Sequence, residues 1–436
     1  MKPKLLSFNF RQFLLTIVLG ILAVGSAWAG PSYRVLHNFN GTDGSALWGG
    51  VTVDQNYRVY GTTAGGGTGN CPYGCGTVFE LSQANGSWVE TTVHDFQGGD
   101  GDGTYSSLVM DPTGNLYGVT MAGGKHNRGT AFELLPANAE GQPDSVSQEW
   151  TEGTLYDFCP KQDENGCTDG AGIMLGLVRS SNGKLYGTKS GGGPNGGGVV
   201  FKLAPGRNGW KETVIHGFYP SYYNQPAPDG TAPYAGLISD SAGNLYGTTW
   251  TGGVACAGGN SCGVVYELTP QIGGGWKEIV LHRFRGNGTD GENPGWGALY
   301  MDADGSLYGT TTGGGCCIGV IYKLTPQPDG HWKKKILYQF KGGAKGYGPN
   351  AGVVMDKAGN LYGITDAGGY GDCGVIYKLA PQPTGKWAYT VLHTFGQGDD
   401  GCLPEGNLAI DQNGNLYGGT VLGGAYGAGI VFKLTP

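Results

Sequence analysis

Short segments of alternating apolar and polar residues run along the chain from about residue 32 to its end. Each segment spans 4 to 9 residues, is rich in β-branched and aromatic side chains, and is bounded by Gly, Asn, Asp or Pro. Alternation with a period of two is typical of a strand that buries one face, and the bounding residues favour turns. No segment follows the helical period, so the pattern predicts an all-β chain.

The segments recur in a fixed order that repeats seven times. The clearest marker is the tripeptide L/V-Y-G, whose tyrosines are Tyr60, Tyr117, Tyr186, Tyr246, Tyr308, Tyr362 and Tyr417. Each unit begins with an apolar segment ending in Asp, as at 237–240, followed by N-L-Y-G-T-T, as at 244–249. It continues with G-V-V-F/Y-x-L, as at 263–268, and ends with a segment that starts on Trp and stops on Phe, as at 276–284. Four strands per unit and seven units predict the blades of a β-propeller.

The two ends of the chain indicate how the ring closes. A strand of the fourth type occupies 33–39, ahead of the first unit, whereas the last unit ends at Pro436 without one. In a ring, 33–39 would pair beside 429–434 as the outermost strand of the last blade, which removes an open sheet edge. We therefore predict a seven-bladed β-propeller with four strands per blade, closed by the N-terminal strand, with residues 30–436 forming a single domain.

The repeated N-L-Y-G-T-T, G-G and G-x-V-F/Y-x-L motifs resemble those of the GloVer tandem-repeat family of exported bacterial proteins, over residues 33–436. The first unit departs from the pattern at 56–59, and the third departs at Ser180 and Lys184. The resemblance implies propeller-like repeats and export, and it implies no reaction. Members of the family carry varied C-terminal anchors; this sequence ends on its last predicted strand, and we expect no anchor.

The N-terminus has the features of a secretory signal peptide. Basic residues precede an apolar stretch at 13–24, which is too short to span a membrane, and a small-x-small cleavage pattern ends at Ala29. We predict that residues 1–29 are a signal peptide cleaved after Ala29. The mature protein is then secreted or periplasmic, where disulfides can form.

Composition narrows the class of partner. Gly supplies 88 of 436 residues without a three-residue period, which excludes collagen, and an aromatic content of 11% is enough to build a core. Removal of 1–29 changes the net charge from −7 to −10, because it takes away three basic residues and no acidic one. A negative chain binds nucleic acid phosphates poorly, and no apolar run is long enough for a membrane span. We expect a monomer with no nucleic acid partner and no span in the mature chain.

Ten cysteines, all in predicted loops of one face, are an even number and predict five disulfides. Antiparallel strands bring the loop that leads into each unit to the same face as the loop between its second and third strands. The pairs predicted from proximity are Cys71–Cys75, Cys159–Cys167, Cys256–Cys262 and, across two loops, Cys373–Cys402. Cys316 and Cys317 are then left as a vicinal disulfide or as two thiols.

One position in the loops that lead into the innermost strands varies in a way that scaffold positions do not. Its seven residues are Trp48, Tyr105, Met174, Tyr234, Trp296, Asn350 and Glu405. Variation with an aromatic bias at the mouth of a channel suggests a contact surface, which Trp250 in a neighbouring loop would extend. The candidate ligand-binding residues are Trp48, Tyr105, Tyr234, Trp296, Trp250 and Glu405. The alternative is that these rings pack beneath the loops.

Histidines and Asp-Gly pairs also repeat, and we expect both to be structural. Five of the seven histidines fall at one strand position, where the other two units have Tyr156 and Tyr338. The Asp-Gly pairs of six loops favour turns over a Ca²⁺ site. The sequence has no nucleophile elbow, phosphate-binding loop or metal-ligand spacing, so we predict no catalytic residue, no metal and no cofactor.

These features predict an exported binding module that recognises a polar polymer, such as a glycan, at the channel mouth, rather than an enzyme. Two alternatives stay open. One is an extracellular polysaccharide-active enzyme, a lyase or a hydrolase, for which the acidic residues of the rim and Glu405 are candidates. The other is a scaffold for contacts with proteins.

Overall fold

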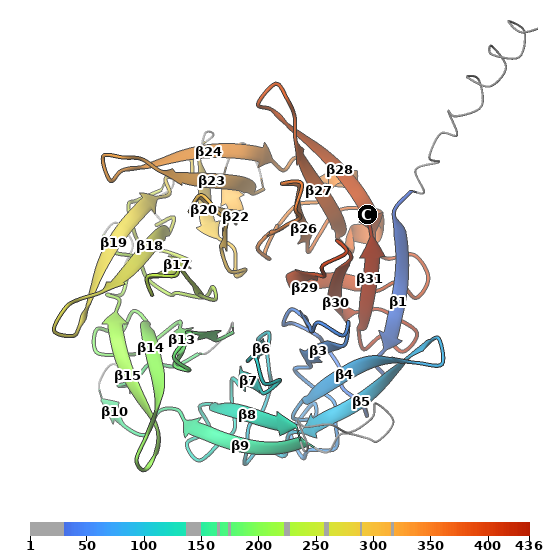
Figure 1. Cartoon of the computed structure of the whole chain (residues 1–436), viewed down its shortest axis with the longest axis horizontal. Helices are drawn as coiled ribbons and strands as arrows, with labels where there is room; N and C mark the ends of the chain where they lie inside the picture. Colours follow the sequence, from blue (N-terminus) through green and yellow to red (C-terminus); the bar gives the residue numbers. More distant parts are fainter. Residues whose placement is uncertain are drawn as a thin grey trace, which may run out of the picture.

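The computed structural model describes residues 30–136, 150–163, 166–172, 176–221, 227–256, 261–287, 290–314 and 318–436. The predicted signal peptide, Met174 and the adjacent cysteines Cys316 and Cys317 lie outside these residues. Within them, the strands form seven sheets arranged as blades around a central axis, as Figure 1 shows. The protein is a seven-bladed β-propeller, as predicted. The described residues contain no helix long and apolar enough to cross a membrane.

In every blade the strand order, from the axis outward, follows the order of the repeat. Blade 1 consists of β2 (Thr52–Val53), β3 (Val59–Thr62), β4 (Thr77–Ala84) and β5 (Ser87–Asp95). Blade 2 consists of β6 (Val109–Met110), β7 (Leu116–Val119), β8 (Thr130–Pro136) and β9 (Trp150–Asp157). Blade 3 consists of β12 (Val178–Arg179), β13 (Leu185–Lys189), β14 (Val199–Gly206) and β15 (Gly209–Gly217). A small hairpin of β10 (Gln162–Asp163) and β11 (Gly166–Cys167) precedes blade 3.

Blades 4 to 6 repeat this plan. Blade 4 consists of β16 (Ile238–Ser239), β17 (Leu245–Thr249), β18 (Val264–Pro270) and β19 (Trp276–Arg283). Blade 5 consists of β21 (Tyr300–Met301), β22 (Leu307–Gly314), β23 (Val320–Pro326) and β24 (Trp332–Gln339). Blade 6 consists of β25 (Val354–Met355), β26 (Leu361–Thr365), β27 (Val375–Pro381) and β28 (Trp387–Thr394). In blade 5, β20 (Gly291–Pro294) also pairs with β22. Two short 3-10 turns, η1 (Gly343–Lys345) and η2 (Tyr370–Asp372), lie in the loops of blade 6.

Blade 7 joins the two ends of the chain. It consists of β29 (Cys402–Ile410), β30 (Leu416–Leu422), β31 (Ile430–Thr435) and, outermost, β1 (Ser32–Asn38). β1 runs antiparallel to β31, with a register from Ser32 opposite Thr435 to Asn38 opposite Ile430. The two strands lie side by side in Figure 1. The predicted closure by the N-terminal strand is confirmed.

The turn before each second strand explains the D-x-x-G-N-L-Y element of the repeat. In blade 4, Asp240 Oδ1 accepts hydrogen bonds from the backbone N–H groups of Ala242 and Asn244, each at 2.9 Å. The hydroxyl of Tyr246 donates to Asp240 Oδ2 at 3.1 Å. A single carboxylate therefore closes the turn and fixes the tyrosine of the following strand.

Aromatic side chains link each blade to the next. A Phe just after each outermost strand packs against a ring on the third strand of the following blade, with ring centroids 5.1 to 5.5 Å apart. The pairs are Phe39–Phe79, Phe96–Phe132, Phe158–Phe201, Phe218–Tyr266, Phe284–Tyr322, Phe340–Tyr377 and Phe395–Phe432. The second strand must carry Gly at this level, because a Cβ at Gly187 would lie 2.6 Å from the ring of Phe201.

Candidate functional site

Two sets of loops meet on one face of the propeller. The loops that lead into the blades form backbone bridges with the loops between second and third strands: Ser45 with Gly65, Asp102 with Ala122, Ala171 with Gly191, Thr231 with Thr251, and Tyr347 with Ala367. We call the surface formed by these two sets of loops the loop face. The aromatic residues singled out in the sequence lie in these loops.

Four disulfides brace the loop face, and they are pairings that the sequence predicts. They are Cys71–Cys75, Cys159–Cys167, Cys256–Cys262 and Cys373–Cys402. The first three are local, whereas Cys373–Cys402 joins the loop between β26 and β27 to the first residue of β29. Structural disulfides of this number indicate folding in an oxidising compartment.

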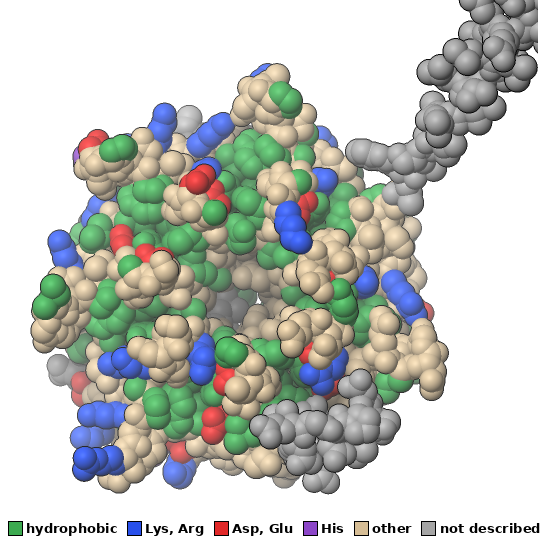
Figure 2. All heavy atoms as spheres, in the orientation of Figure 1, with side chains coloured by type: hydrophobic (Ala, Val, Ile, Leu, Met, Phe, Trp, Pro, Cys, Tyr) green, Lys and Arg blue, Asp and Glu red, His purple; other side chains and the backbone are tan. Residues whose placement is uncertain are grey.

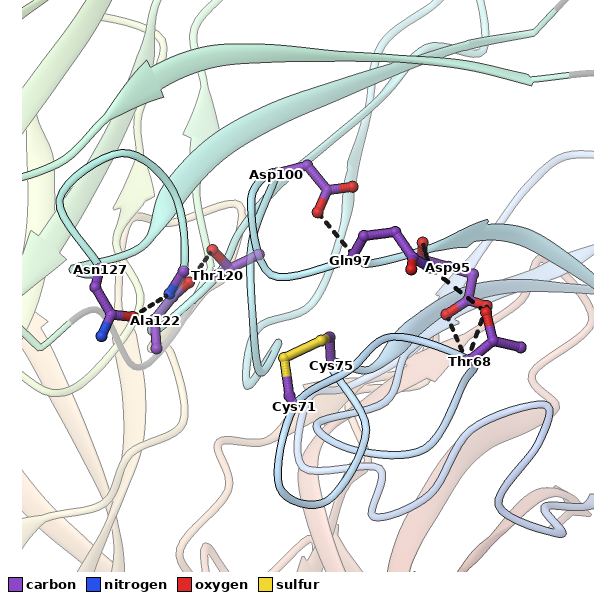
Figure 3. Close-up of a disulfide and its surroundings, with 10 residues drawn as sticks. Thr68, Cys71, Cys75, Asp95, Gln97, Asp100, Thr120, Ala122 and Asn127 are labelled. Atoms are coloured by element: carbon purple, nitrogen blue, oxygen red, sulfur yellow. Dashed lines mark hydrogen bonds between the residues drawn. A yellow bond between two sulfur atoms is a disulfide. The ribbon is translucent and has the colours of Figure 1, made fainter.

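Figure 3 shows the surroundings of the Cys71–Cys75 bond. The backbone N–H and the hydroxyl of Thr68 both donate to Asp95 Oδ2, at 3.0 and 2.5 Å. The backbone N–H of Gln97 donates to Asp100 Oδ1 at 2.8 Å. The disulfide and the Thr68 hydrogen bonds thus hold the loop between β3 and β4, and the Gln97 hydrogen bond holds the loop after β5, so both loops lose less entropy when a ligand binds.

A cavity opens where the loop face meets the central axis. Its aromatic lining comes from Trp48, Tyr105 and Trp296, and small and aliphatic residues form much of the rest. Its polar lining comes from Ser107, Asn350, Glu405 and Asn407. The space within it is about 850 Å³, part of which is open to solvent. The ring of blades also surrounds a hollow at the centre of the space-filling view in Figure 2. We call this cavity the channel mouth.

The aromatic residues in the wall of the channel mouth and directly behind it form two groups. Trp48 and Tyr105 contact each other with ring centroids 5.8 Å apart. Tyr234, Trp250 and Trp296 form the second group, with centroids 6.1 to 6.4 Å apart. All five rings are half-buried, so neighbouring rings hold them in place while part of each stays accessible.

Two of the predicted binding residues lie behind the cavity rather than in its wall. Tyr234 and Trp250 pack on Trp296, whereas Trp48, Tyr105, Trp296 and Glu405 line the cavity itself. Trp48, Tyr105, Trp296 and Glu405 therefore line the cavity while Tyr234 and Trp250 support Trp296, and contact with a ligand stays a prediction for all six residues.

Glu405 is buried, and it lies close to a second carboxyl group. Asn350 Nδ2 donates to Asp366 Oδ2 at 2.7 Å and to Glu405 Oε1 at 3.5 Å, so one amide bridges the two. Burial, and then the charge of Asp366, raise the pKa of Glu405 to about 8. Burial also raises the pKa of Asp366 to about 6. At neutral pH this pair holds a proton on Glu405 and a negative charge on Asp366.

Asp366 was not among the candidates taken from the sequence, although a signal was present. It directly follows the second Thr position of its repeat, the position that Trp250 occupies in blade 4. The seven residues at this position are Ala64, Met121, Ser190, Trp250, Thr312, Asp366 and Val421. The position of Trp48 and Trp296 is a candidate because its residue type varies between units. The same criterion applied to this position identifies Asp366.

The repeated histidines contact carboxylates of the loops that follow them. The nitrogen–oxygen distances are 3.0 Å for His37–Asp43, 2.9 Å for His94–Asp100 and 3.1 Å for His393–Asp400. The same carboxylates shape their loops; for example, Asp43 Oδ1 accepts a hydrogen bond from the N–H of Asn40 at 2.9 Å. These contacts support a structural role for the histidines and a turn role for the rim carboxylates.

The fold and the site define a class of protein: a disulfide-braced, seven-bladed β-propeller with an aromatic cavity at one end of its channel. The model of the Gloeobacter/Verrucomicrobia repeat family matches residues 24–144, 145–352 and 254–436, and the chain belongs to this family. This agrees with the resemblance carried by the repeat motifs. No curated protein matches the chain significantly.

Solved structures are similar to this chain at low sequence identity. The polysaccharide lyase Uly1 is 11% identical, with a TM-score of 0.52 over 92% of this chain and 99% of the lyase. A protein from Lactobacillus plantarum is 13% identical, with a TM-score of 0.48 over 80% of this chain and 85% of its own. A Thermus thermophilus protein described as a putative oxidoreductase (glucose dehydrogenase) is 13% identical, with a TM-score of 0.39 over 93% of this chain and 100% of its own. The likeness to the lyase shows the fold alone.

Proposed function

We propose that the protein is a binding module for a polar polymer of the glycan class, held at the channel mouth. The observation that carries the proposal is the set of half-buried rings of Trp48, Tyr105 and Trp296 around one cavity. Such rings offer rigid apolar faces on which sugar rings can stack, while a few polar groups fix the orientation of the ligand. Asn350 and Glu405 supply these polar groups in the same wall.

Exposed tyrosines on the loop face support a ligand longer than the cavity. Four tyrosines of these loops are largely exposed: Tyr73 at 89%, Tyr219 at 59%, Tyr370 at 60% and Tyr426 at 69%. An exposed tyrosine offers a ligand both an apolar ring face and a hydroxyl group. Their placement in the loops around the channel mouth suits a polymer that continues across the surface.

Charge and rigidity narrow the class of polymer. The net charge of −7 disfavours anionic polymers, so neutral or cationic chains fit better. The four disulfides lie on the loop face, and Cys256–Cys262 closes the loop that begins at Trp250. Loops that are already ordered lose little entropy when the ligand binds.

A second candidate function is cleavage of the same polymer. The observation in its favour is the bridged pair of Glu405 and Asp366, whose pKa values of about 8 and about 6 suit a general acid and a general base. A polysaccharide lyase shares the fold at 11% identity, which offers an analogy and no residue assignment. Binding is preferred here because Glu405 lines the cavity whereas Asp366 does not, so the cavity wall presents one carboxyl group rather than the two that glycoside hydrolysis uses.

A retention and cleavage screen tests both candidates. The processed, oxidised protein is passed over galactomannan, chitosan and alginate as neutral, cationic and anionic polysaccharides, and products are followed by new reducing ends and by the absorbance of unsaturated sugars. We expect retention on galactomannan or chitosan and none on alginate, without cleavage. Retention on none of them, or on alginate alone, would overturn the proposal. Cleavage that is lost in Glu405→Gln while retention persists would establish the second candidate.

A further inference from the structure

Every seam between neighbouring blades repeats one arrangement of side chains near the rim of the loop face. The outermost strand of one blade supplies His or Tyr. The loop that follows this strand supplies Asp in most seams. The third residue comes from the middle of the outermost strand of the next blade. This last position always faces the same Leu of the repeat: Glu212 faces Leu203, Glu278 faces Leu268 and Lys334 faces Leu324. Equivalent seams can therefore be compared residue by residue.

The seam between blades 3 and 4 brings three metal-ligating side chains together. They are His216 of β15, Asp229 of the loop that follows, and Glu278 of β19, and one ligand atom from each lies within 4.8 Å of the other two. The distance from His216 Nε2 to Asp229 Oδ2 is 3.8 Å, which is longer than a hydrogen bond.

The polar atoms of this cluster are not satisfied by the protein. His216 Nε2, Asp229 Oδ1 and Glu278 Oε1 are buried and have no hydrogen-bond partner among the described residues. Burial of unpaired polar atoms costs free energy unless another group compensates them. Three side chains that converge from two blades and a loop, each with such an atom, indicate a missing common partner.

In both flanking seams, the ammonium group of a lysine is the partner of the carboxylates. Between blades 4 and 5, Lys334 stands at the position of Glu278 and its ammonium group pairs with Asp290. Between blades 2 and 3, the ammonium group of Lys189 lies 2.7 Å from Glu212 Oε1 and 3.1 Å from Asp169 Oδ2. A lysine of the chain thus neutralises the equivalent carboxylates on either side.

The seam between blades 3 and 4 has neither lysine. Thr249 occupies the repeat position of Lys189, and Glu278 occupies that of Lys334. The cation that acts on this cluster is Arg283, an exposed residue whose Nε donates to the carbonyl of Pro228 at 3.1 Å. Its charge acts on Asp229 and Glu278, but burial outweighs it and raises the pKa of both carboxyls.

We propose that His216, Asp229 and Glu278 bind a divalent transition-metal ion of the Zn²⁺ class, which takes the place of the lysines in the flanking seams. One imidazole nitrogen with two carboxylate oxygens suits Zn²⁺, whereas Ca²⁺ and Mg²⁺ prefer ligands made of oxygen alone. Around tetrahedral Zn²⁺ the ligand atoms lie roughly 3.3 Å apart. The distance of 3.8 Å between His216 and Asp229 therefore needs to close by roughly 0.5 Å, and the widest distance of the cluster by at most roughly 1.5 Å.

The ion would join the outermost strands of two blades to the loop that leads to the channel mouth. Asp229 and Tyr234 belong to the same loop, so the ion would also fix the loop that carries one of the aromatic residues. The inference does not depend on the proposed function, because it rests on the seam and not on the cavity.

Calorimetric titration of Zn²⁺ into the metal-stripped, oxidised protein tests the proposal. Free thiols are alkylated first, so that Cys316 and Cys317 cannot bind the ion. We expect one saturable site in the wild type, and a loss of affinity of about tenfold or more in both His216→Gln and Glu278→Gln. Glu90→Gln is the matched control, because in its seam His37 and Asp43 already contact each other at 3.0 Å; it should leave this site unchanged.

Glu278→Lys provides a variant that should fold, since it copies the seam that contains Lys334. It should melt at a higher temperature than the metal-free wild type, and Zn²⁺ should raise the melting temperature of the wild type alone. The proposal is overturned if the wild type shows no saturable binding. It is equally overturned if Glu278→Lys or the two Gln variants bind Zn²⁺ as the wild type does.

Discussion

At the scale of single residues, Glu405 is the side chain of the channel mouth whose ionisation responds most to folding. Burial, and then the neighbouring Asp366, raise its pKa from an ordinary value of 4.5 to about 8. Between these two pH values the folded protein keeps a proton that the unfolded chain has released. The free energy of unfolding contributed by this group is therefore greatest below pH 4.5 and falls as the pH rises toward about 8.

We predict that Glu405→Gln removes this dependence, because the amide imitates the neutral carboxyl group. The variant should gain stability relative to the wild type as the pH rises from about 5 to about 8, by at most about 1.4 kcal/mol per pH unit. Urea denaturation across this range measures the difference. Burial lowers the pKa of His216 to about 4. Because such groups are present in both proteins, their contributions to the pH dependence of stability cancel in the comparison. Parallel pH profiles would contradict the assignment of a protonated Glu405.

At the scale of elements, β1 determines whether the ring is closed. It pairs with β31, and Leu36 and Phe39 of this N-terminal segment belong to the core between blades 7 and 1. Deleting residues 30–40 would uncover the edge of β31 and remove these core side chains. We predict a lower melting temperature and aggregation detected by light scattering, both reversed by adding the peptide 30–40. A monomeric deletion variant with the wild-type melting temperature would refute this role.

The disulfide between Cys373 and Cys402 is the second prediction at this scale. It closes a loop with a sequence separation of 29, whereas Cys71 and Cys75 are separated by 4. Closing a longer loop removes more entropy from the unfolded chain, by about 3–4 kcal/mol for a loop of this length. Replacing Cys373 and Cys402 by Ala should therefore lower the melting temperature in calorimetry more than replacing Cys71 and Cys75 does. The opposite order would show that the entropy of the unfolded chain does not dominate.

At the scale of the whole molecule, the fold was predictable because the turn and strand residues of each unit and the sevenfold repetition of the unit indicate the same architecture. Six of the seven units carry the turn Asp, which Ser180 replaces in the third, and every unit carries the Gly that admits an aromatic ring and the closing Phe. The additional strand at 33–39 indicates closure. Loop order along antiparallel strands was also enough to pair the cysteines that the structure describes.

The contacts between blades were harder to predict from the sequence. Glu405 belongs to β29 of blade 7 and Asp366 follows β26 of blade 6, and only the assembled ring brings both carboxyls to one amide, that of Asn350. Within blade 3, the ammonium group of Lys189 on β13 reaches Glu212 on β15, two strands away, and this contact also depends on how the side chains pack. The sequence shows that Lys189 replaces the Thr of this repeat position, but it does not show that Glu212 is the partner of Lys189.

The central claim is that the aromatic residues of the channel mouth hold a polymer. Its most direct test is calorimetric titration of a soluble galactomannan oligosaccharide or chitosan oligomer into the wild type, the double variant Trp48→Ala/Trp296→Ala, and Trp210→Ala, a scaffold tryptophan of β15. The account predicts that the double variant folds and loses about 2 kcal/mol or more of binding free energy, roughly thirtyfold in Kd. Trp210→Ala should melt at a lower temperature and keep its affinity. A folded double variant that binds with the wild-type Kd would contradict the account.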